Sequence, residues 1–261
     1  SLENLRQVKA AVDRRGARLI LDGSRVVENA WYIQKHEDGQ ADRSIADIVK
    51  QIAKTAHGLL FDGGQDAKTN TGGLITTDDP DDFERYMNEV VVFEGLHTYG
   101  GMAGRTMEVL ARGLREMVDE AEAHWVMTQN ERFTQRLRDG GVPLERGCDG
   151  AYILADAFLP HIDDHQQDTL AAALYLTSGV RTVATGRTGR DPLLPVQVPR
   201  LSMTNEQLDQ VAEAIIQLHT QADRVHGLQP LAQGEWRDEM AYHWVFPDLP
   251  LFTFETFPYE I

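Results

Sequence analysis

The sequence has 261 residues, of which 42% are apolar, enough to build the core of one large domain or of two modest ones. Its 41 acidic and 25 basic residues give a formal net charge of −16, which argues against a nucleic-acid partner because phosphate binding needs a basic face. The apolar runs are only a few residues long and nothing resembles a signal peptide, so we expect neither a membrane span nor secretion. The single cysteine, Cys148, cannot form an internal disulfide, which fits a reducing cytoplasm.

The first part of the chain alternates helical and strand patterns. The patterns predict helices over 2–15, 26–33, 45–52 and 80–90, and strands over 18–21, 59–61 and 74–76. This order is typical of a mainly parallel sheet in an α/β protein. It begins on a helix with no strand before it, so we expect the chain to lack the amino-terminal part of its sheet.

Helix starts are marked by capping residues. Ser44 is followed three residues later by Asp47, and Thr204 by Gln207, which is the capping-box pattern. The pair Asp79-Pro80 likewise indicates the start of a helix.

The second part of the chain has longer helices and short strands. Helical spacing from Ala103 to about Leu137 predicts one or two long helices. Beyond Gly140-Gly141 we expect strands over 151–154, 180–183 and 198–203, helices over 165–177 and 205–224, and an irregular strand over 240–257.

The stretch from Ala56 to Gly73 has the character of a site. An apolar strand, Leu59 to Phe61, leads into a polar, Gly-rich loop and then into a second apolar segment, Leu74 to Thr76. In an α/β protein this arrangement presents polar groups at the carboxyl edge of a sheet, where ligands bind. Gly, Asp and Asn also cluster in ordinary surface turns, so the composition alone leaves both interpretations open.

Four motifs, in order along the chain, resemble one known family. The run Glu94–Arg105 (EGLHTYGGMAGR) is similar to the E-G-x-x-[ST]-Y-G-G-x-x-G motif of the β-eliminating lyases. Asp22–Ala30 resembles their D-x-x-R-x-x-E-N-A segment, Asn70–Gly73 their N-x-G-G, and Phe252–Ile261 their carboxyl end. The resemblance covers nearly the whole chain and corresponds to about the last three-fifths of a family member.

The resemblance implies a fold and a reaction. The expected fold class is α/β, of the fold-type I pyridoxal 5′-phosphate (PLP) transferase type. Residues 1–118 would form the carboxyl-terminal half of the large domain and residues 119–261 a smaller α+β domain. The implied reaction is a tryptophanase-like β-elimination from an aromatic or β-substituted amino acid, which gives pyruvate and ammonia.

The resemblance also implies PLP, a monovalent cation such as K⁺, and a homotetramer. A separate chain supplying the amino-terminal half is the alternative partner, and a catalytically inactive binding or regulatory subunit is the alternative function.

The resemblance assigns a role to individual residues. Asp22 matches the carboxylate that pairs with the pyridine nitrogen, and Arg25 the arginine beside the cofactor's phenolic oxygen. Arg200 matches the arginine that binds the substrate carboxylate, a task suited to a planar guanidinium. Tyr99 matches an active-site tyrosine and Asn70 a cation-site residue. Without the family, Asp22 is typical of a helix N-cap, Arg25 of a solvated charge, Tyr99 of packing and Asn70 of a turn.

The sequence departs from the family at four positions. Gly64-Gln65 replaces two consecutive lysines, of which the second forms the Schiff base with PLP. Asp62 stands where the family has a serine near the cofactor's phosphate, and Thr185 matches the position at which tyrosine phenol-lyases have a phenol-recognising arginine. We therefore expect tyrosine to be a poor substrate.

Lys68 is the lysine nearest to the changed position. It lies three residues past Gln65, but the spacing from Gly58 to Gly72 matches the family without a gap, which places Lys68 elsewhere on the loop. Gln65 cannot replace the lysine, because an amide nitrogen is not basic. Four possibilities remain: Lys68 takes over the role, PLP binds noncovalently, a partner supplies the lysine, or the chain no longer uses PLP.

Overall fold

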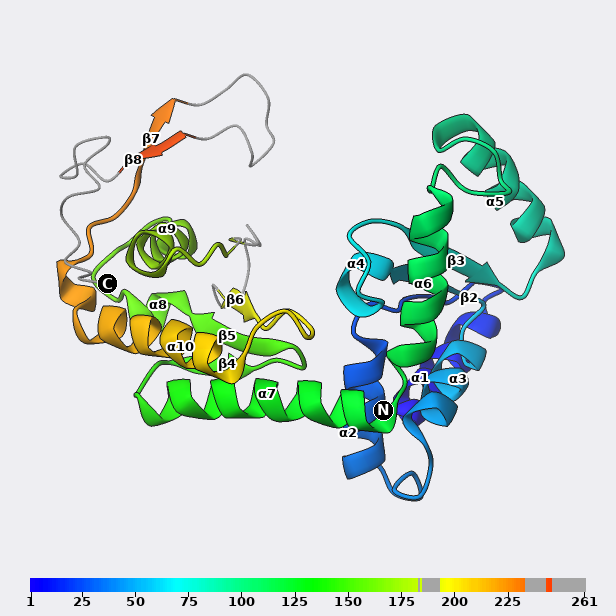
Figure 1. The fold of residues 1–261 in the computed structure, drawn as a ribbon, viewed down its shortest axis with the longest axis horizontal. Helices are drawn as coiled ribbons and strands as arrows, with labels where there is room; N and C mark the ends of the chain where they lie inside the picture. Colours follow the sequence, from blue (N-terminus) through cyan, green and yellow to red (C-terminus); the bar gives the residue numbers. More distant parts are fainter. Residues whose placement is uncertain (183, 185–192, 233–242, 246–261) are drawn as a thin grey trace. The chain divides into compact units, whose positions relative to one another are not determined.

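The computed structural model describes residues 1–182, 184, 193–232 and 243–245 (Figure 1). The chain divides into two compact units, Ser1–Thr128 with Pro199–Ser202, and Gln129–Val198 with Met203–Ile261. The first unit therefore extends past the boundary at residue 118 that the sequence suggested. Of the helices in the described ranges, none is long and apolar enough to cross a membrane.

The first unit is built from helices around a small sheet. Its elements are α1 (Leu2–Asp13), β1 (Ile20–Asp22), α2 (Val26–His36), α3 (Ile45–Lys54), β2 (Gly58–Asp62), α4 (Gly63–Asp66), β3 (Gly73–Thr77), α5 (Pro80–Phe93), α6 (Gly104–Glu116) and the start of α7 (Glu120–Asp139). Two of the expected helix starts are confirmed, since the Ser44 hydroxyl accepts the Asp47 N–H and the Asp79 carboxylate accepts the N–H groups that follow Pro80. The helical stretch expected over 103–137 is two helices, α6 and α7.

The sheet of the first unit has the strand order β1-β2-β3. Strands β1 and β2 are parallel, with Ile20 opposite Gly58, but β3 runs antiparallel to β2, with Leu74 opposite Phe61. The expectation of a mainly parallel sheet is therefore wrong for β3. The physical reason is the short connection through α4, because a parallel return needs a crossover of a dozen or more residues.

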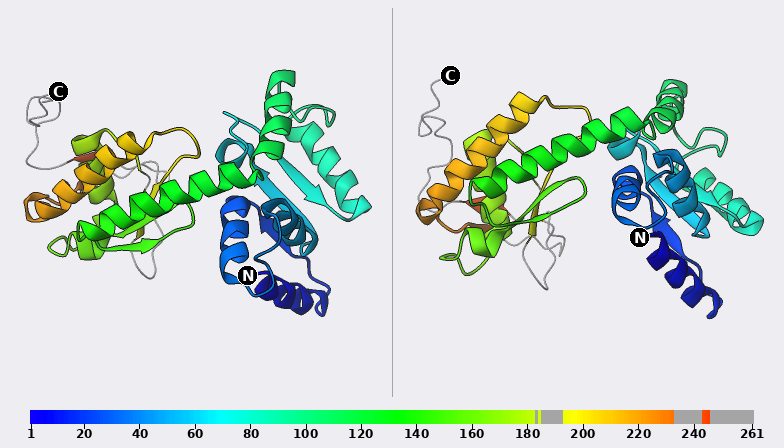
Figure 2. Two further views of the ribbon diagram at one scale, coloured as in Figure 1. Left: turned by 60° about the horizontal axis from the view of Figure 1, so that its bottom comes forward. Right: turned by 90° about the horizontal axis from the view of Figure 1, so that it is seen from below.

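The two faces of this sheet differ. Leu59 and Phe61 are buried in a core cluster that also includes side chains of α1, α2, α3 and α6. On the alternate positions, Ile20, Leu60 and Ile75 are 39%, 43% and 53% exposed. Because strand side chains alternate between faces, these three lie on the same face, and that face is apolar and exposed. Figure 2 shows this unit in two further views, from the blue elements through cyan to the green helix α6.

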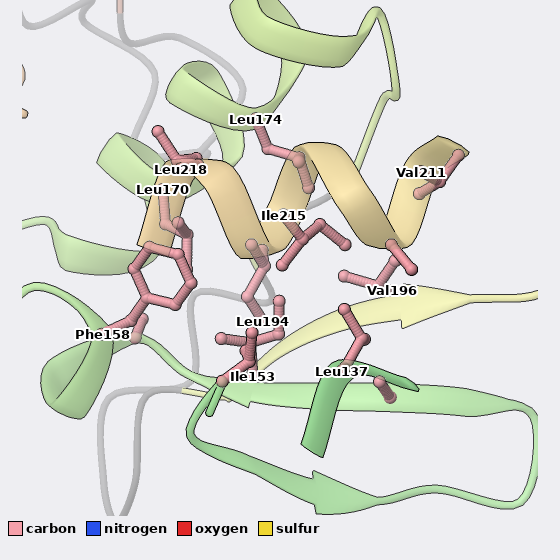
Figure 3. Packing of buried hydrophobic residues seen from close by; sticks show 14 of the residues in the cluster. Leu137, Ile153, Phe158, Leu170, Leu174, Leu194, Val196, Val211, Ile215 and Leu218 are labelled. Atoms are coloured by element: carbon pink, nitrogen blue, oxygen red, sulfur yellow. The ribbon is translucent and has the colours of Figure 1, made fainter. Parts of the chain in front are cut away.

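The second unit has a three-stranded antiparallel sheet, β4-β5-β6, packed with helices, and a separate antiparallel pair, β7-β8. It contains the rest of α7, then β4 (Leu144–Arg146), β5 (Gly150–Leu154), α8 (Ala155–Phe158), α9 (Gln166–Ser178), β6 (Leu193–Gln197), α10 (Asn205–Thr220), a short 3₁₀ turn η1 (Ala222–Arg224), β7 (Gln229–Ala232) and β8 (His243–Val245). Its core joins Leu137 of α7, Ile153 of β5, Leu174 of α9 and Ile215 of α10 (Figure 3). The capping box at Thr204 is confirmed.

Two strands were placed wrongly from the sequence. Residues 180–182 have no regular structure and 183 lies outside the described residues, while 198–203 form a turn that follows β6. Strand β6, which was not predicted, contains Pro195 and lies at the edge of the order β4-β5-β6, where a missing N–H is tolerated. Of the expected strand over 240–257, only β8 lies within the described residues.

Candidate functional site

A tight turn at the carboxyl end of β1 carries the first two candidate residues. Asp22 is the last residue of β1, and its Oδ1 accepts the Ser24 N–H at 2.9 Å. The Gly23 N–H donates to the Leu60 carbonyl at 2.7 Å, which ties the turn to β2. Hydrogen bonds from Ser24 lower the pKa of Asp22 below its ordinary value, so the turn presents an ionised, exposed carboxylate.

Arg25 ends this turn and begins α2. Its backbone is left-handed, with φ 63° and ψ 25°, and its own side chain does not cap the helix. The Arg25 N–H instead donates to Asp66 Oδ2 at 2.9 Å, and Arg25 Nη1 lies 3.8 Å from Asp66 Oδ1. A long contact of 3.5 Å joins Arg25 Nη1 to the Gln65 carbonyl oxygen. The structure thus brings Asp22, Arg25 and the loop after β2 to the same end of the sheet.

The loop after β2 is closed at its base. The Gly63 N–H donates to the Gly72 carbonyl at 2.9 Å, and Asp62 Oδ1 accepts the Gly64 N–H at 2.8 Å as the N-cap of α4. Gln65 is exposed, and its side chain forms no hydrogen bond with another described residue. The exposed Asp62 carboxylate is itself an anion, so a phosphate beside it would be repelled.

Asp66 follows Gln65 in the sequence and, unlike it, is buried. Its side chain is fully buried, and burial raises its pKa to about 6. The hydrogen bond from the Arg25 N–H and the charges of Arg25 and Arg200 oppose the rise, whereas the charge of Glu28 adds to it. Asp66 Oδ1 has no hydrogen-bond partner among the described residues.

Lys68 is held by two carboxylates. Its Nζ lies 2.9 Å from Glu116 Oε2 and 2.6 Å from Glu122 Oε2. Burial alone would lower the pKa of Lys68, but the hydrogen bonds and charges of Glu122 and Glu116 outweigh it and raise the pKa. Hydrogen bonds from Arg112 and Lys68 lower the pKa of Glu116 to about 2. In this arrangement Lys68 is an ammonium ion without a free electron pair, so it is not a nucleophile.

Arg200 is also paired inside the first unit. Its Nη2 lies 2.8 Å from Glu28 Oε1, and its Nη1 lies 3.3 Å from Glu122 Oε1 and 3.4 Å from the Met117 carbonyl. The side chains of Arg200 and Glu28 are each 1% exposed. The expected position of Arg200 inside a strand is wrong, because residues 199–202 form a turn. A substrate carboxylate would have to displace Glu28, so the role of Arg200 in substrate binding stays a prediction.

The remaining candidates lie apart from these contacts. Tyr99 is 40% exposed in the turn before α6, and its ring lies over Gly95. Asn70 is exposed in the loop, and Thr185 lies outside the described residues. The described part of the chain holds no group of three or more His, Cys, Asp or Glu side chains placed to bind a metal ion. The assignments of Tyr99 and Asn70 therefore stay predictions.

The sequence analysis missed the carboxylates that hold the candidate cations. Glu28, Asp66 and Glu122 contact Arg200, Arg25 and Lys68 from distant parts of the chain. One signal was available for Glu28, since it lies within the D-x-x-R-x-x-E-N-A segment on the apolar side of α2.

Comparison with known proteins gives an independent result. A family model described as Beta-eliminating lyase matches residues 1–225. The tyrosine phenol-lyase of Symbiobacterium sp. (strain SC-1) is 35% identical over 246 residues, which cover 88% of this chain and 54% of the relative. The tryptophanase of Salinibacter ruber is 37% identical over 229 residues, which cover 82% of this chain and 49% of the relative. The chain thus spans about half the length of these curated relatives, and the resemblance seen in the motifs is confirmed.

A solved structure is similar in fold. The serine palmitoyltransferase of Sphingomonas wittichii matches with a TM-score of 0.54 at 15% identity, over 85% of this chain and 52% of that chain. Together with the family model, this match confirms the expected fold class.

Proposed function

Since the chain belongs to the β-eliminating lyase family, we propose that it is a PLP-dependent carbon–carbon lyase, or one subunit of such an enzyme. Its substrate would be an aromatic or β-substituted amino acid, and its products pyruvate and ammonia. The observation that carries the proposal is the turn that places an ionised Asp22 three residues from an anchored Arg25 at the carboxyl end of β1.

The residues of this turn fit PLP. The Asp22 carboxylate suits a protonated ring nitrogen, and the Arg25 guanidinium suits the phenolic oxygen of the ring. When bound, PLP supplies an electron sink for the carbanion formed on the substrate. Because one short turn carries both side chains, the protein would hold these two polar groups on one side of the ring with little freedom.

The residues fit noncovalent binding better than covalent attachment. Gln65 has no basic nitrogen, and the Lys68 amine is committed to Glu116 and Glu122. We propose that this chain holds PLP without a covalent bond of its own, and that a lysine from a partner moves the protons if elimination occurs.

The exposed face of the β1-β2-β3 sheet supports a partner in this proposal. Ile20, Leu60 and Ile75 form an apolar surface, and the carboxylates of Asp22 and Asp62 stand at one end of the same face. Exposed apolar surfaces of this kind mark interaction sites. A second copy of the chain, as in the tetramer expected from the family, or a separate chain with the rest of the family sequence would cover this face.

Absorbance titration with PLP tests the cofactor. We expect a shifted PLP spectrum with the wild-type protein and a weaker one with Asp22→Asn, because the amide no longer stabilises the protonated ring nitrogen. Borohydride reduction followed by peptide mass mapping should leave every lysine of this chain unlabelled, Lys68 included. A pyridoxyl group on Lys68 would overturn the noncovalent assignment. The variant Gln65→Lys is the positive control, and we expect it to be labelled at residue 65.

Activity is measured as pyruvate release from tryptophan, tyrosine and S-alkyl cysteines. The assay is run with and without a chain that carries the amino-terminal half of the family sequence. We expect tyrosine to be the poorest of these substrates because Thr185 replaces the phenol-recognising arginine, and efficient phenol release would contradict this.

A binding or regulatory subunit is the second candidate function. The observation that favours it is the loss of a reactive amine, since Gln65 is not basic and Lys68 is ion-paired. If no amino acid yields pyruvate in the reconstituted complex while PLP or an amino acid still binds, this second function is the correct one.

A further inference from the structure

Asp66 has no role in the function proposed above, although it touches Arg25 at two points. Its Oδ2 accepts the Arg25 backbone N–H at 2.9 Å, and its Oδ1 lies 3.8 Å from Arg25 Nη1. The two residues are 41 positions apart in the sequence, so this contact joins the loop after β2 to the start of α2. We propose that Asp66 is a positioning residue that fixes the turn Asp22–Arg25 and thereby aims both side chains at the cofactor.

The backbone of Arg25 explains why the turn needs an anchor. A left-handed conformation is unfavourable for a residue with a side chain and persists only where the surroundings hold it. Arg25 does not cap α2 with its own side chain, and the Asp66 carboxylate accepts an N–H at the helix start in its place. A carboxylate suits this position because the amino end of a helix carries partial positive charge.

The surroundings of Asp66 show that its charge is directed at Arg25. The carboxylate is fully buried, and the charged side chains that act most strongly on it are Arg25 and Glu28 of the α2 segment and Arg200 of the 199–202 turn. Glu28 is already paired with Arg200 at 2.8 Å. Helix α6 packs close to the neighbouring Ala67, whose carbonyl oxygen would lie 1.9 Å from a Cβ added at Gly113. Arg25 is therefore the cation that Asp66 contacts directly.

Only the predicted effect of Asp66 on PLP binding rests on the proposed function. If PLP binds at Asp22 and Arg25, removal of the Asp66 anchor should weaken PLP binding although Asp66 itself does not touch the cofactor. The anchoring of the turn is a property of the protein without cofactor, and it can be measured separately.

The experiment compares the wild-type chain with Asp66→Asn and Asp66→Ala. The first readout is hydrogen–deuterium exchange of the peptide that spans residues 22–30, without PLP. We expect Asp66→Ala to speed exchange in this peptide by about tenfold, the effect of losing one helix cap, while Asp66→Asn keeps most of the protection because an amide oxygen still accepts the N–H. The matched control is Asp149→Asn, which removes another buried carboxylate from the second unit and should leave the peptide unchanged.

The second readout is the dissociation constant of PLP from pH 5 to pH 8. We expect a rise of about tenfold in Asp66→Ala and a smaller rise in Asp66→Asn, which restores the hydrogen bond but not the charge. The wild-type protein should also bind PLP more weakly below pH 6, as Asp66 takes up a proton, and the Asn variant should lack this step.

The outcomes separate the two proposals. If the wild-type protein binds no PLP, the proposed function fails, and the exchange of residues 22–30 alone decides the anchoring role. If Asp66→Ala folds, as judged by circular dichroism, and its exchange in this peptide equals that of the wild type, the positioning role is wrong whatever the result with PLP. If Asp66→Ala does not fold, the pH step present in the wild type and absent in Asp66→Asn decides the matter.

Discussion

At the scale of single residues, the buried ion pair of Arg200 and Glu28 gives a prediction on stability. Removal of Arg200 would leave the Glu28 carboxylate, which is 1% exposed, buried without the guanidinium that pairs with it. We expect Arg200→Met to lower the free energy of unfolding by about 3–5 kcal/mol, measured by urea denaturation. The control Arg6→Met removes a guanidinium that is 52% exposed and 3.8 Å from Glu3, and it should cost less than about 1 kcal/mol. Adding Glu28→Gln to Arg200→Met should recover part of the loss, and no loss in the single variant would show that the pair contributes nothing.

Asp66 gives a prediction on pH at the same scale. Its pKa in the folded chain is about 6, above its ordinary value of 3.8, so between these values the folded protein binds more protons than the unfolded one. The contribution of Asp66 to the free energy of unfolding is therefore fully present below pH 3.8 and is lost as the pH rises through 6, by up to about 3 kcal/mol. We expect the stability of the wild type relative to Asp66→Asn to fall by that amount from about pH 3 to about pH 7. An equal pH dependence in the two proteins would contradict the raised pKa.

At the scale of elements, α6 supports the loop that carries Gln65. A Cβ added at Gly113 of α6 would lie 1.9 Å from the Ala67 carbonyl oxygen, whereas one added at Gly104 would meet nothing within 4 Å. We expect Gly113→Ala to lower the free energy of unfolding by about 1–3 kcal/mol, because the loop or the helix must shift. The matched variant Gly104→Ala should be neutral or slightly stabilising. Both are measured by urea denaturation, and equal effects of the two variants would mean that α6 and the loop do not touch.

The elements also show what could be predicted from the sequence. The starts of α3, α5 and α10 were predicted because each depends on a side chain that bonds a backbone N–H a few residues away. Strand β6 was missed because Pro195 interrupts its pattern, and its tolerance depends on being at a sheet edge, which only the assembled sheet defines.

The candidate site was predictable only in part, because some of its contacts are defined only by the assembled fold. The position of Asp22 at the end of β1 follows from local pattern. The pairing of Arg200 with Glu28 joins residues 172 positions apart, and no local pattern specifies which carboxylate a distant arginine meets. Lys68 was considered for its closeness to Gln65 in sequence, but Glu116 and Glu122, which hold it, come from α6 and α7.

At the scale of the whole molecule, the exposed apolar face of the first unit predicts association. Side chains such as Leu60 and Ile75 lose contact with water when the face is covered, which favours a complex. We expect the wild-type chain to sediment as a species larger than its own 29.3 kDa, and the double variant Leu60→Lys with Ile75→Lys to shift toward the monomer. The control Val8→Lys changes an exposed apolar side chain on α1 and should leave the assembly unchanged. A wild-type chain that sediments only as a compact monomer would contradict the prediction.

The closed base of the loop after β2 has a consequence for how such a protein changes over generations. The hydrogen bond between Gly63 and Gly72 holds the loop's ends together, and the exposed side chain of Gln65 does not contribute to it. A mutation at residue 65 therefore alters the chemistry of the loop with little effect on folding. Glutamine and lysine codons differ by one nucleotide, so a lineage can lose or regain a reactive amine there in one step. Selection on folding would not oppose that step, and descendants with and without the amine can share one scaffold.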